Sequence, residues 1–350
     1  MTTARRPNSG ADLAALLRPI AAKLQPPFAI ALGSPKEAAD LVAALPSVPA
    51  VCWQLDLFQA ARLREELAAR SLTAAVVTLA DLWDLPQSAQ TLLYPVALGG
   101  ERSLKLDVVE QAYHALAPQG HFVVSSPYEQ DSVLPPALKK VFSRVHVPMG
   151  ADNALFWCRR EGERARRRHE MTFQVRANET TSLRFVSRPG VFSYGRFDHG
   201  ARALVETAEI HPGDRIVDLG CGCGTNGILA AQRCGPDGFV AFVDSNVRAI
   251  ALTELNARNL GMPQFQTLAT ADAAGLPDAS FDVVLANPPY YAQLSIARMF
   301  IERGRALLKK GGRFYLVTKM LEQVAEQMQE VFGEADVFER RGYFIFQAVK

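Results

Sequence analysis

Short apolar runs alternate with longer amphipathic stretches along the whole chain. The apolar runs are rich in Val, Ile, Leu and Phe, as at Val51–Leu55, Phe239–Val243 and Phe281–Ala286. Short strands that alternate with helix-period stretches are typical of β-α-β units. The pattern therefore predicts an α/β protein built on doubly wound, Rossmann-like parallel sheets.

This pattern occurs twice in the chain. Residues 56–72 read DLFQAARLREELAARSL and residues 244–260 read DSNVRAIALTELNARNL, so both begin with Asp and end with E-L-x-A-R-x-L. Other segments match in the same order: 29–33 (AIALG) with 216–220 (IVDLG), 115–124 with 306–316, and the closing strands 154–158 with 343–349. Ordered matches indicate two copies of one fold, in which Asp56 corresponds to Asp244 and Gly33 to Gly220.

We expect a first domain at residues 1–158, a basic linker at 159–184 and a second domain at 185–350. The first copy lacks the further glycines that the second carries after its first strand, and it offers only Tyr94-Pro95-Val96 in place of Asn287-Pro288-Pro289-Tyr290. We therefore predict that the first domain kept the fold and lost its ligand. The linker begins with RREGERARRR at 159–168, which is either a solvated surface or a contact to a phosphate backbone.

The composition narrows the class of protein. Of the 350 residues 49% are hydrophobic, and no apolar run reaches membrane-spanning length, so we expect no membrane partner. Five cysteines do not suggest a disulfide framework and favour a cytoplasmic location. Cys221 and Cys223 have no second ligand pair at zinc spacing, so we expect no metal. The net charge of +2 neither requires nor excludes nucleic acid, and nothing requires an oligomer.

A glycine-rich turn follows the first strand of the second copy. It reads DLGCGCG, with Asp218 before Gly220, Gly222 and Gly224, and such a turn lets the backbone come close to a ligand. Asp244 closes the next strand, where an acid can hydrogen-bond ribose hydroxyls. Asp272 follows another apolar stretch; it is either an acid that meets an adenine amino group or a surface loop residue. Residues 222–227 also spell G-x-G-x-x-G, which leaves a dinucleotide cofactor open.

The most specific motif is Asn287-Pro288-Pro289-Tyr290, at the end of an apolar strand. The prolines fix the backbone at the carboxyl end of the strand, where open α/β sheets bind ligands. The Asn287 side-chain oxygen and the Pro288 carbonyl can accept hydrogen bonds from a planar NH2 group, which turns the nitrogen lone pair toward a methyl sulfonium. Tyr290 would stack on the acceptor, and Asn287 would also lie beside the cofactor. With the glycine loop, this motif predicts an S-adenosylmethionine-dependent N-methyltransferase that works by positioning and fixed dipoles.

Two residues upstream of the loop are candidates for the substrate pocket. Phe192 and Arg196 could line the pocket for the acceptor base, or they could belong to a packed lid segment.

From Phe185 to the C-terminus the chain resembles the class I methyltransferases that act on guanine N2 in ribosomal RNA. The resemblance rests on VDLGCGCG at 217–224, NPPY at 287–290, V-F-S at 191–193 and F-D-x-G at 197–200. Members of that family also carry a degenerate N-terminal copy of the methyltransferase domain. The resemblance implies that the loop residues and the three acids bind the cofactor, that residues 287–290 grip the base, and that the first domain helps to hold ribosomal RNA or a ribosomal subunit.

Other functions remain open from the sequence. N-P-P-Y also occurs in enzymes that methylate adenine N6 or a protein glutamine, because the motif recognises a planar NH2 group. A non-catalytic RNA-binding assembly factor and an NAD-dependent oxidoreductase are the alternatives from other classes.

Overall fold

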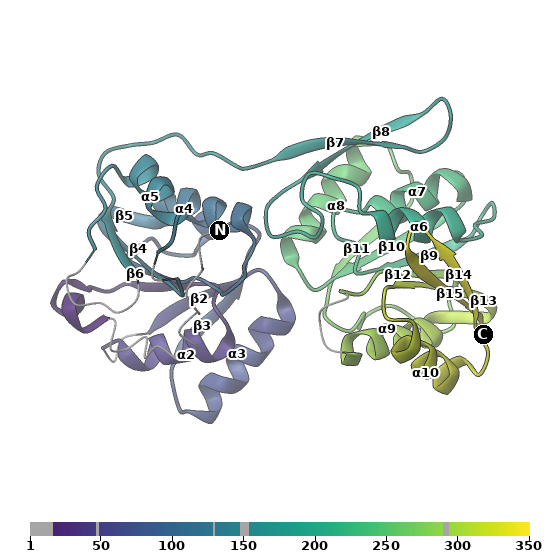
Figure 1. Ribbon diagram of the computed structural model, residues 1–350, viewed down its shortest axis with the longest axis horizontal. Helices are drawn as coiled ribbons and strands as arrows, with labels where there is room; N and C mark the ends of the chain where they lie inside the picture. Colours follow the sequence, from purple (N-terminus) through teal and green to yellow (C-terminus); the bar gives the residue numbers. More distant parts are fainter. Residues whose placement is uncertain (1–16, 47–48, 129, 148–153, 290–293) are drawn as a thin grey trace. The chain divides into compact units, whose positions relative to one another are not determined.

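The structure is a computed structural model that describes residues 17–46, 49–128, 130–147, 154–289 and 294–350 (Figure 1). The chain divides into two compact units, Met1–His169 and Glu170–Lys350. Each unit is an α/β layer structure with its own sheet and its own hydrophobic core.

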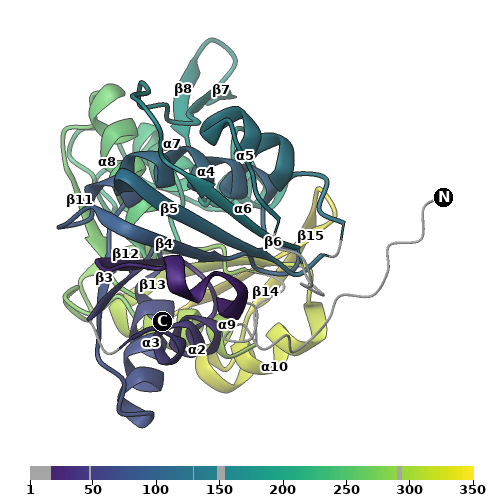
Figure 2. The same ribbon diagram turned by 90° about the vertical axis from the view of Figure 1, so that its left-hand side faces the viewer.

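The first unit has one sheet with the strand order β3-β2-β1-β4-β5-β6. Helices η1, α2 and α3 cover one face, while η2, α4 and α5 cover the other (Figure 2). The strands are β1 (Phe28–Ala31), β2 (Ala50–Gln54), β3 (Ala74–Thr78), β4 (Ala89–Pro95), β5 (Leu116–Ser126) and β6 (Ala154–Arg159). The helices are η1 (Arg18–Lys23), α2 (Pro35–Ala44), α3 (Leu57–Ala69), η2 (Leu82–Asp84), α4 (Arg102–Ala115) and α5 (Leu134–Phe142).

The second unit repeats this order as β11-β10-β9-β12-β13-β15-β14 and adds a hairpin, β7-β8. Helices α6, α7 and α8 pack on one face of the sheet, and α9 and α10 pack on the other. The strands are β7 (Met171–Arg176), β8 (Ser182–Ser187), β9 (Arg215–Leu219), β10 (Phe239–Asp244), β11 (Phe265–Ala269), β12 (Phe281–Ala286), β13 (Leu308–Thr318), β14 (Asp336–Arg340) and β15 (Tyr343–Val349). The helices are α6 (His199–Thr207), α7 (Thr225–Cys234), α8 (Val247–Asn259), α9 (Leu294–Leu307) and α10 (Leu321–Phe332).

The shared strand order confirms the prediction of two tandem Rossmann-like units. The likeness extends to an irregularity, because the register shifts once between β4 and β5 and once, at the matching place, between β12 and β13. Gly120 and Gly312 lie at these shifts, and a Cβ atom on either would come within 3.0 Å of a neighbouring atom. Both copies therefore need glycine at this point.

The residue-by-residue alignment expected from the sequence is wrong at two places. Asp56 is the N-cap of α3 and accepts from the Gln59 amide, so its counterpart is Asn246, the N-cap of α8. Gln54, which ends β2, therefore corresponds to Asp244, which ends β10. Because the two helix sequences are similar, the alignment made from the sequence is shifted by two residues here.

The second error concerns the loop after the first strand. The amide of Leu32 donates to the Trp53 carbonyl at 2.9 Å, and the amide of Gly220 donates to the Val243 carbonyl at 2.8 Å. These equivalent bonds place Leu32, and not Gly33, at the position of Gly220. Leu32 has a φ of 57°, a region where a residue with a Cβ atom is strained.

The strands that close the two sheets run antiparallel to their neighbours. β6 pairs with β5, and β15 pairs with β13, in antiparallel registers. Doubly wound sheets commonly carry an antiparallel edge strand on an otherwise parallel sheet.

The segment 159–184, expected as a basic linker, is divided between the two units. Arg164 lies 3.1 Å from Glu110, and Arg168 lies 3.0 Å from Asp81; both acids belong to the first unit and are buried. The rest of the segment contains β7 and the start of β8, which pair with each other. Part of the basic run thus neutralises buried carboxylates.

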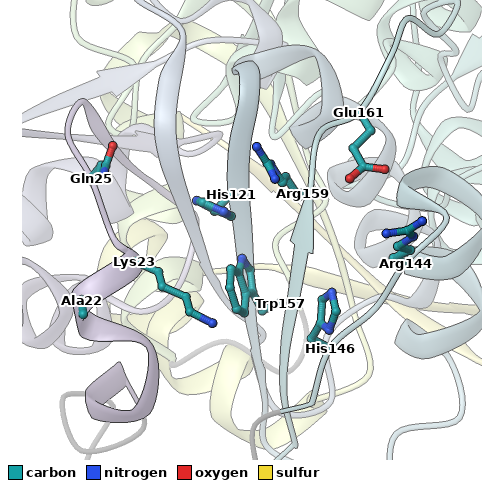
Figure 3. Close-up of a pocket in the computed structure, with 9 residues that line it drawn as sticks. All are labelled: Ala22, Lys23, Gln25, His121, Arg144, His146, Trp157, Arg159 and Glu161. Carbon is teal, nitrogen blue, oxygen red and sulfur yellow. The ribbon is translucent and has the colours of Figure 1, made fainter.

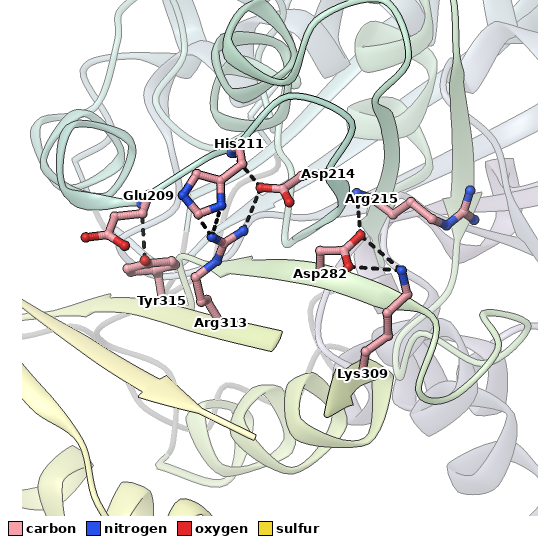
Figure 4. Close-up of polar contacts among 8 residues, drawn as sticks. All are labelled: Glu209, His211, Asp214, Arg215, Asp282, Lys309, Arg313 and Tyr315. Carbon is pink, nitrogen blue, oxygen red and sulfur yellow. Dashed lines mark hydrogen bonds and ion pairs between the residues drawn. The ribbon is translucent and has the colours of Figure 1, made fainter. Parts of the chain in front are cut away.

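The starts of the second unit's strands are tied together by ion pairs, at the end of the sheet opposite the glycine loop (Figure 4). Asp282 accepts from the Arg215 amide and from Lys309 Nζ, both at 2.9 Å. Arg313 donates to Asp214 at 2.6 Å. These contacts fix β9, β12 and β13 relative to one another and leave their carboxyl ends for the site.

Candidate active site

The glycine loop of the second unit connects the end of β9 to the start of α7. Gly220, Gly222 and Gly224 all have positive φ angles, which glycine adopts without strain. A Cβ atom on Gly222 would meet no atom within 4 Å, so the backbone here faces open space. The loop can therefore bring its main chain against a ligand at the N-terminus of α7.

Asp218 is fully buried at the end of β9. Its Oδ2 atom accepts a hydrogen bond from the Gly227 amide at 2.8 Å, while Oδ1 finds no partner in the part of the chain that the structure describes. Burial raises the pKa of Asp218 to about 7, an effect that the Gly227 bond opposes and the charge of Asp244 reinforces. A buried acid with an unsatisfied oxygen is a mark of a ligand site.

Asp244 joins the end of β10 to the glycine loop. Its Oδ2 atom accepts from the Gly222 amide at 2.9 Å, and its Oδ1 atom accepts from the Asn246 amide at 2.8 Å. The carboxylate therefore has a fixed orientation at the carboxyl end of a strand, the position where an acid can reach ribose hydroxyls.

Polar residues of α8 that the sequence analysis missed hold the loop in place. Thr253 donates to the Gly222 carbonyl and Asn256 donates to the Cys223 carbonyl, both at 2.9 Å. Asn256 also exchanges hydrogen bonds with the backbone of Val186, and the fully buried Arg248 donates to the Pro189 carbonyl at 2.5 Å. A signal was available, because these polar residues occur on the helix face that also carries the buried Ala249, Leu252 and Ala257.

One hollow brings the loop, the N-P-P-Y motif and the upstream segment together. Its lining includes Gly220, Gly222, Asn287, Phe192 and Arg196. Three chain segments that are distant in sequence thus converge at the carboxyl ends of β9 and β12.

The remaining motif residues have different surroundings. Pro288 is buried and Pro289 is exposed, so the first proline anchors the turn while the second faces outward. Tyr290 lies outside the described residues. Asp198, also part of the lining, is the N-cap of α6 and accepts from the Ala201 amide at 2.9 Å.

Asp272 does not line this hollow. It is exposed and accepts from Thr270 Oγ1 at 2.7 Å and from the Ala274 amide at 3.0 Å. The Thr270 bond is the main cause that lowers the pKa of Asp272.

The equivalent place in the first unit is filled by its own side chains. Gln54 Nε2 donates to the carbonyls of Leu32 and Gly33, both at 3.3 Å. A Cβ atom on Gly33 would lie 2.6 Å from Pro95, the residue in the position of Asn287. Ile30 takes the position of Asp218. The first unit therefore keeps the sheet but lacks the acids and the space of the second.

The fold of the second unit and the residues around its glycine loop resemble those of class I methyltransferases. Residues 182–347 match the family model described as Methyltransferase small domain, which covers almost all of this unit. The second unit is therefore similar to that domain family, in agreement with the resemblance that the motifs indicated.

Two relatives that match the second half of the chain are named as methyltransferases. Ribosomal RNA small subunit methyltransferase C of Chromohalobacter salexigens is 33% identical over 183 residues, which are 49% of this chain and 53% of that protein. The protein of the same name from Pseudomonas syringae is 32% identical over 171 residues, 47% of this chain and 51% of that protein. The chain thus spans about half the length of the curated relatives it matches.

A solved structure has a similar fold over nearly the whole length of the chain. The T. thermophilus 16S rRNA N2 guanine methyltransferase, solved in complex with AdoMet and guanosine, superposes with a TM-score of 0.73 at 20% sequence identity. The match covers 99% of this chain and 93% of that one. Both chains therefore share the fold of two tandem Rossmann-like units.

No helix is long and apolar enough to cross a membrane within the described part of the chain. The same residues contain no group of three or more His, Cys, Asp or Glu side chains that could hold a metal ion.

Proposed function

We propose that the chain transfers a methyl group from S-adenosylmethionine to the exocyclic N2 amine of a guanosine in ribosomal RNA. The observation that carries this proposal is the convergence of the glycine loop, Asn287 and the pair Phe192 and Arg196 on one hollow. The named relatives act on small-subunit ribosomal RNA, which supports the same substrate class here. A ribosomal substrate places the reaction in the cytoplasm, and the reaction needs neither a metal nor an oligomer.

The residues of the second unit fit the cofactor. The open backbone at Gly222, the oriented carboxylate of Asp244 and the unsatisfied oxygen of Asp218 lie around one loop. When bound, S-adenosylmethionine supplies an electrophilic methyl group on a sulfonium. We assign Asp218, Gly220, Gly222, Gly224 and Asp244 to cofactor binding, with Asp272 as a peripheral contact to the adenine.

The chain's own contribution to chemistry is positioning. The Asn287 side-chain oxygen and the Pro288 carbonyl accept hydrogen bonds from the acceptor NH2 group. These hydrogen bonds localise the nitrogen lone pair and direct it toward the methyl sulfonium. Buried Pro288 keeps this carbonyl fixed at the end of β12. Fixed dipoles of this kind need no reorganisation during the reaction. Phe192, which is 55% exposed, offers a ring for the base, as Tyr290 would in the motif itself.

A guanine inside a helix cannot reach Asn287, because its N2 amine lies within the base stack. The nucleotide must therefore be unpaired or flipped out before methylation. The exposed Arg196 at the rim of the hollow is suited to contact the phosphate of such a nucleotide.

The test is transfer of labelled methyl from S-adenosylmethionine to unmodified ribosomal RNA and ribosomal subunits, followed by digestion to nucleosides and mass analysis. Asn287→Ala is compared with Asn259→Ala, an exposed asparagine at the end of α8. We expect N2-methylguanosine with the wild type and with Asn259→Ala. We expect Asn287→Ala to be slower by a factor of about 100 to 1,000, the usual cost of one lost transition-state contact.

Cofactor binding separates a chemical defect from a folding defect. S-adenosylmethionine should still raise the melting temperature of Asn287→Ala, because the glycine loop, Asp218 and Asp244 are retained. Label in adenosine or in protein glutamine would overturn the guanine assignment but keep the N-methyltransferase. Cofactor binding without label in any acceptor would favour the non-catalytic RNA-binding alternative.

A further inference from the structure

The first unit contains a hollow of its own. It is separate from the place around Gln54 and Pro95 that is equivalent to the glycine-loop site of the second unit. It has a volume of about 420 Å³ and lies at the edge strand β6, between η1, strand β5 and the segment 144–146 (Figure 3). This volume falls in the range of small-molecule sites. No role of the methyl-transfer site requires it.

An accessible aromatic ring forms part of the wall. Trp157 is partly exposed, and Lys23 and His146 flank it in Figure 3. Lys23 Nζ lies 4.2 Å from the ring centroid. The backbones of His146 and Trp157 exchange two hydrogen bonds of 2.8 Å, which hold this wall of the hollow in place. The remaining tryptophans of the chain, Trp53 and Trp83, are 0% and 7% exposed.

The charge of the lining is positive. Lys23, Arg144 and Arg159 contribute cations, and Glu161 is the carboxylate among the lining residues. All four side chains belong to exposed residues, so they can rearrange around a ligand. His121 also lines the hollow, and burial first, and then the charges of Arg159 and Lys23, lower its pKa.

An aromatic face beside several cations matches a nucleotide, which combines a flat base with an anionic phosphate. We propose that this hollow binds one unstacked nucleotide of single-stranded RNA, with the base against Trp157 and the phosphate among Lys23, Arg144 and Arg159. The proposal rests on the proposed function and names a second RNA contact for the same substrate. Lys23 covers the ring when the site is empty and moves to the phosphate when a base replaces it.

The proposal can be tested on the full chain by fluorescence, because the other two tryptophans are buried and Trp157 is the one that a ligand can reach. The probes are hexa-adenylate, AMP and inorganic phosphate. Hexa-adenylate should quench the emission, and Trp157→Phe should abolish the quenching. The double variant Arg144→Ala/Arg159→Ala should weaken hexa-adenylate at least about tenfold and flatten its salt dependence.

The matched control is Lys36→Ala/Arg62→Ala, which removes two exposed cations from α2 and α3 that do not line the hollow. This variant should bind hexa-adenylate as the wild type does. Equal weakening in both double variants would mean that net charge alone drives binding, and it would overturn the proposal. Quenching by AMP with the same affinity as hexa-adenylate would assign the hollow to a free nucleotide and overturn the RNA contact.

Failure of this inference can be distinguished from failure of the proposed function. If ribosomal RNA is methylated with an unchanged KM in Arg144→Ala/Arg159→Ala, the hollow is not an RNA contact while the activity stands. If hexa-adenylate binds through Trp157 but no acceptor is methylated, the nucleotide site stands and the enzyme assignment fails.

Discussion

The Gly227 amide donates a 2.8 Å hydrogen bond to Asp218 Oδ2, across the glycine loop from the strand that carries the acid. This bond joins the end of β9 to the first turn of α7 and uses one of the two carboxylate oxygens. Because Asp218 is fully buried, its charged form is costly even with this bond. The geometry of the loop is therefore coupled to the protonation of a single side chain.

The first prediction concerns the pH dependence of stability. The pKa of Asp218 rises from 3.8 to about 7 on folding. Between these values the folded state holds a proton that the unfolded state has released, so the free energy of unfolding falls as the pH rises. The slope from this group is at most about 1.4 kcal/mol per pH unit and vanishes above pH 7, where both states are ionised.

Denaturant unfolding without cofactor, from pH 4.5 to 8, measures this effect. Asp218→Asn keeps the shape and an acceptor for the Gly227 amide but cannot titrate, so its profile should be flatter than that of the wild type. Asp336→Asn, at an exposed acid on β14, should leave the profile unchanged. Identical slopes for wild type and Asp218→Asn would show that the group does not retain its proton in the folded chain.

The second prediction concerns Asp244 as a ligand of the cofactor. Asp244→Asn retains the size of the side chain but removes its negative charge. The carboxylate accepts a hydrogen bond from the Gly222 amide and, in our assignment, from ribose hydroxyls. Charged hydrogen bonds contribute about 1.5–3 kcal/mol each, so the Kd for S-adenosylmethionine should rise at least about tenfold. Calorimetric titration measures it, with the exposed Asp237→Asn as control. An unchanged Kd would remove Asp244 from the cofactor site.

The sequence was sufficient to predict the class of fold and the duplication. Alternating apolar runs and glycine turns report local structure directly, and the loop at 220–224 and Asn287 do meet at one hollow. The sequence alignment of the two copies was wrong in one helix, because it followed the shared motif E-L-x-A-R-x-L and not the helix N-cap residues. In the structure Asp56 matches Asn246 because both cap helices, and a cap position is set by backbone hydrogen bonds.

Other features could not be predicted because they depend on long-range packing. The contacts of Asn256 with Cys223 and Val186 join residues 33 and 70 positions apart. The direction of β6 and β15 depends on the path of the chain around the sheet edge. The nucleotide-sized hollow in the first unit joins residues from η1 to Glu161, none of which forms a motif.

The third prediction concerns the packing of α7 on the sheet. A Cβ atom on Gly227 would lie 2.3 Å from Phe242 Cε1, so Gly227→Ala should destabilise the second unit by about 1–3 kcal/mol. In the double variant Gly227→Ala/Phe242→Leu the smaller side chain makes room for the methyl group. Thermal unfolding should therefore show less destabilisation than the sum of the two single variants. Additive losses would mean that the two residues do not share this space.

The last prediction decides between the two readings of the basic run at 159–168. Arg164 Nε and Nη2 donate to the two carboxylate oxygens of Glu110 at 3.2 and 3.1 Å, and Glu110 is only 4% exposed. Removing the guanidinium leaves a buried carboxylate without its cation, which costs about 3 kcal/mol. Arg164→Ala should thus lower the stability of the first unit, whereas the equally charged but exposed Arg167→Ala should not.

Glu110→Gln separates charge pairing from RNA contact, since it removes the need for the cation. In the double variant Arg164→Ala/Glu110→Gln much of the lost stability should return. If Arg164 acts only within the first unit, the RNA affinity should fall in Arg164→Ala and return in the double variant, as the stability does. If Arg164→Ala unfolds at the same denaturant concentration as the wild type but binds ribosomal RNA more weakly, the run is a phosphate contact, and its ion pair with Glu110 contributes little in solution.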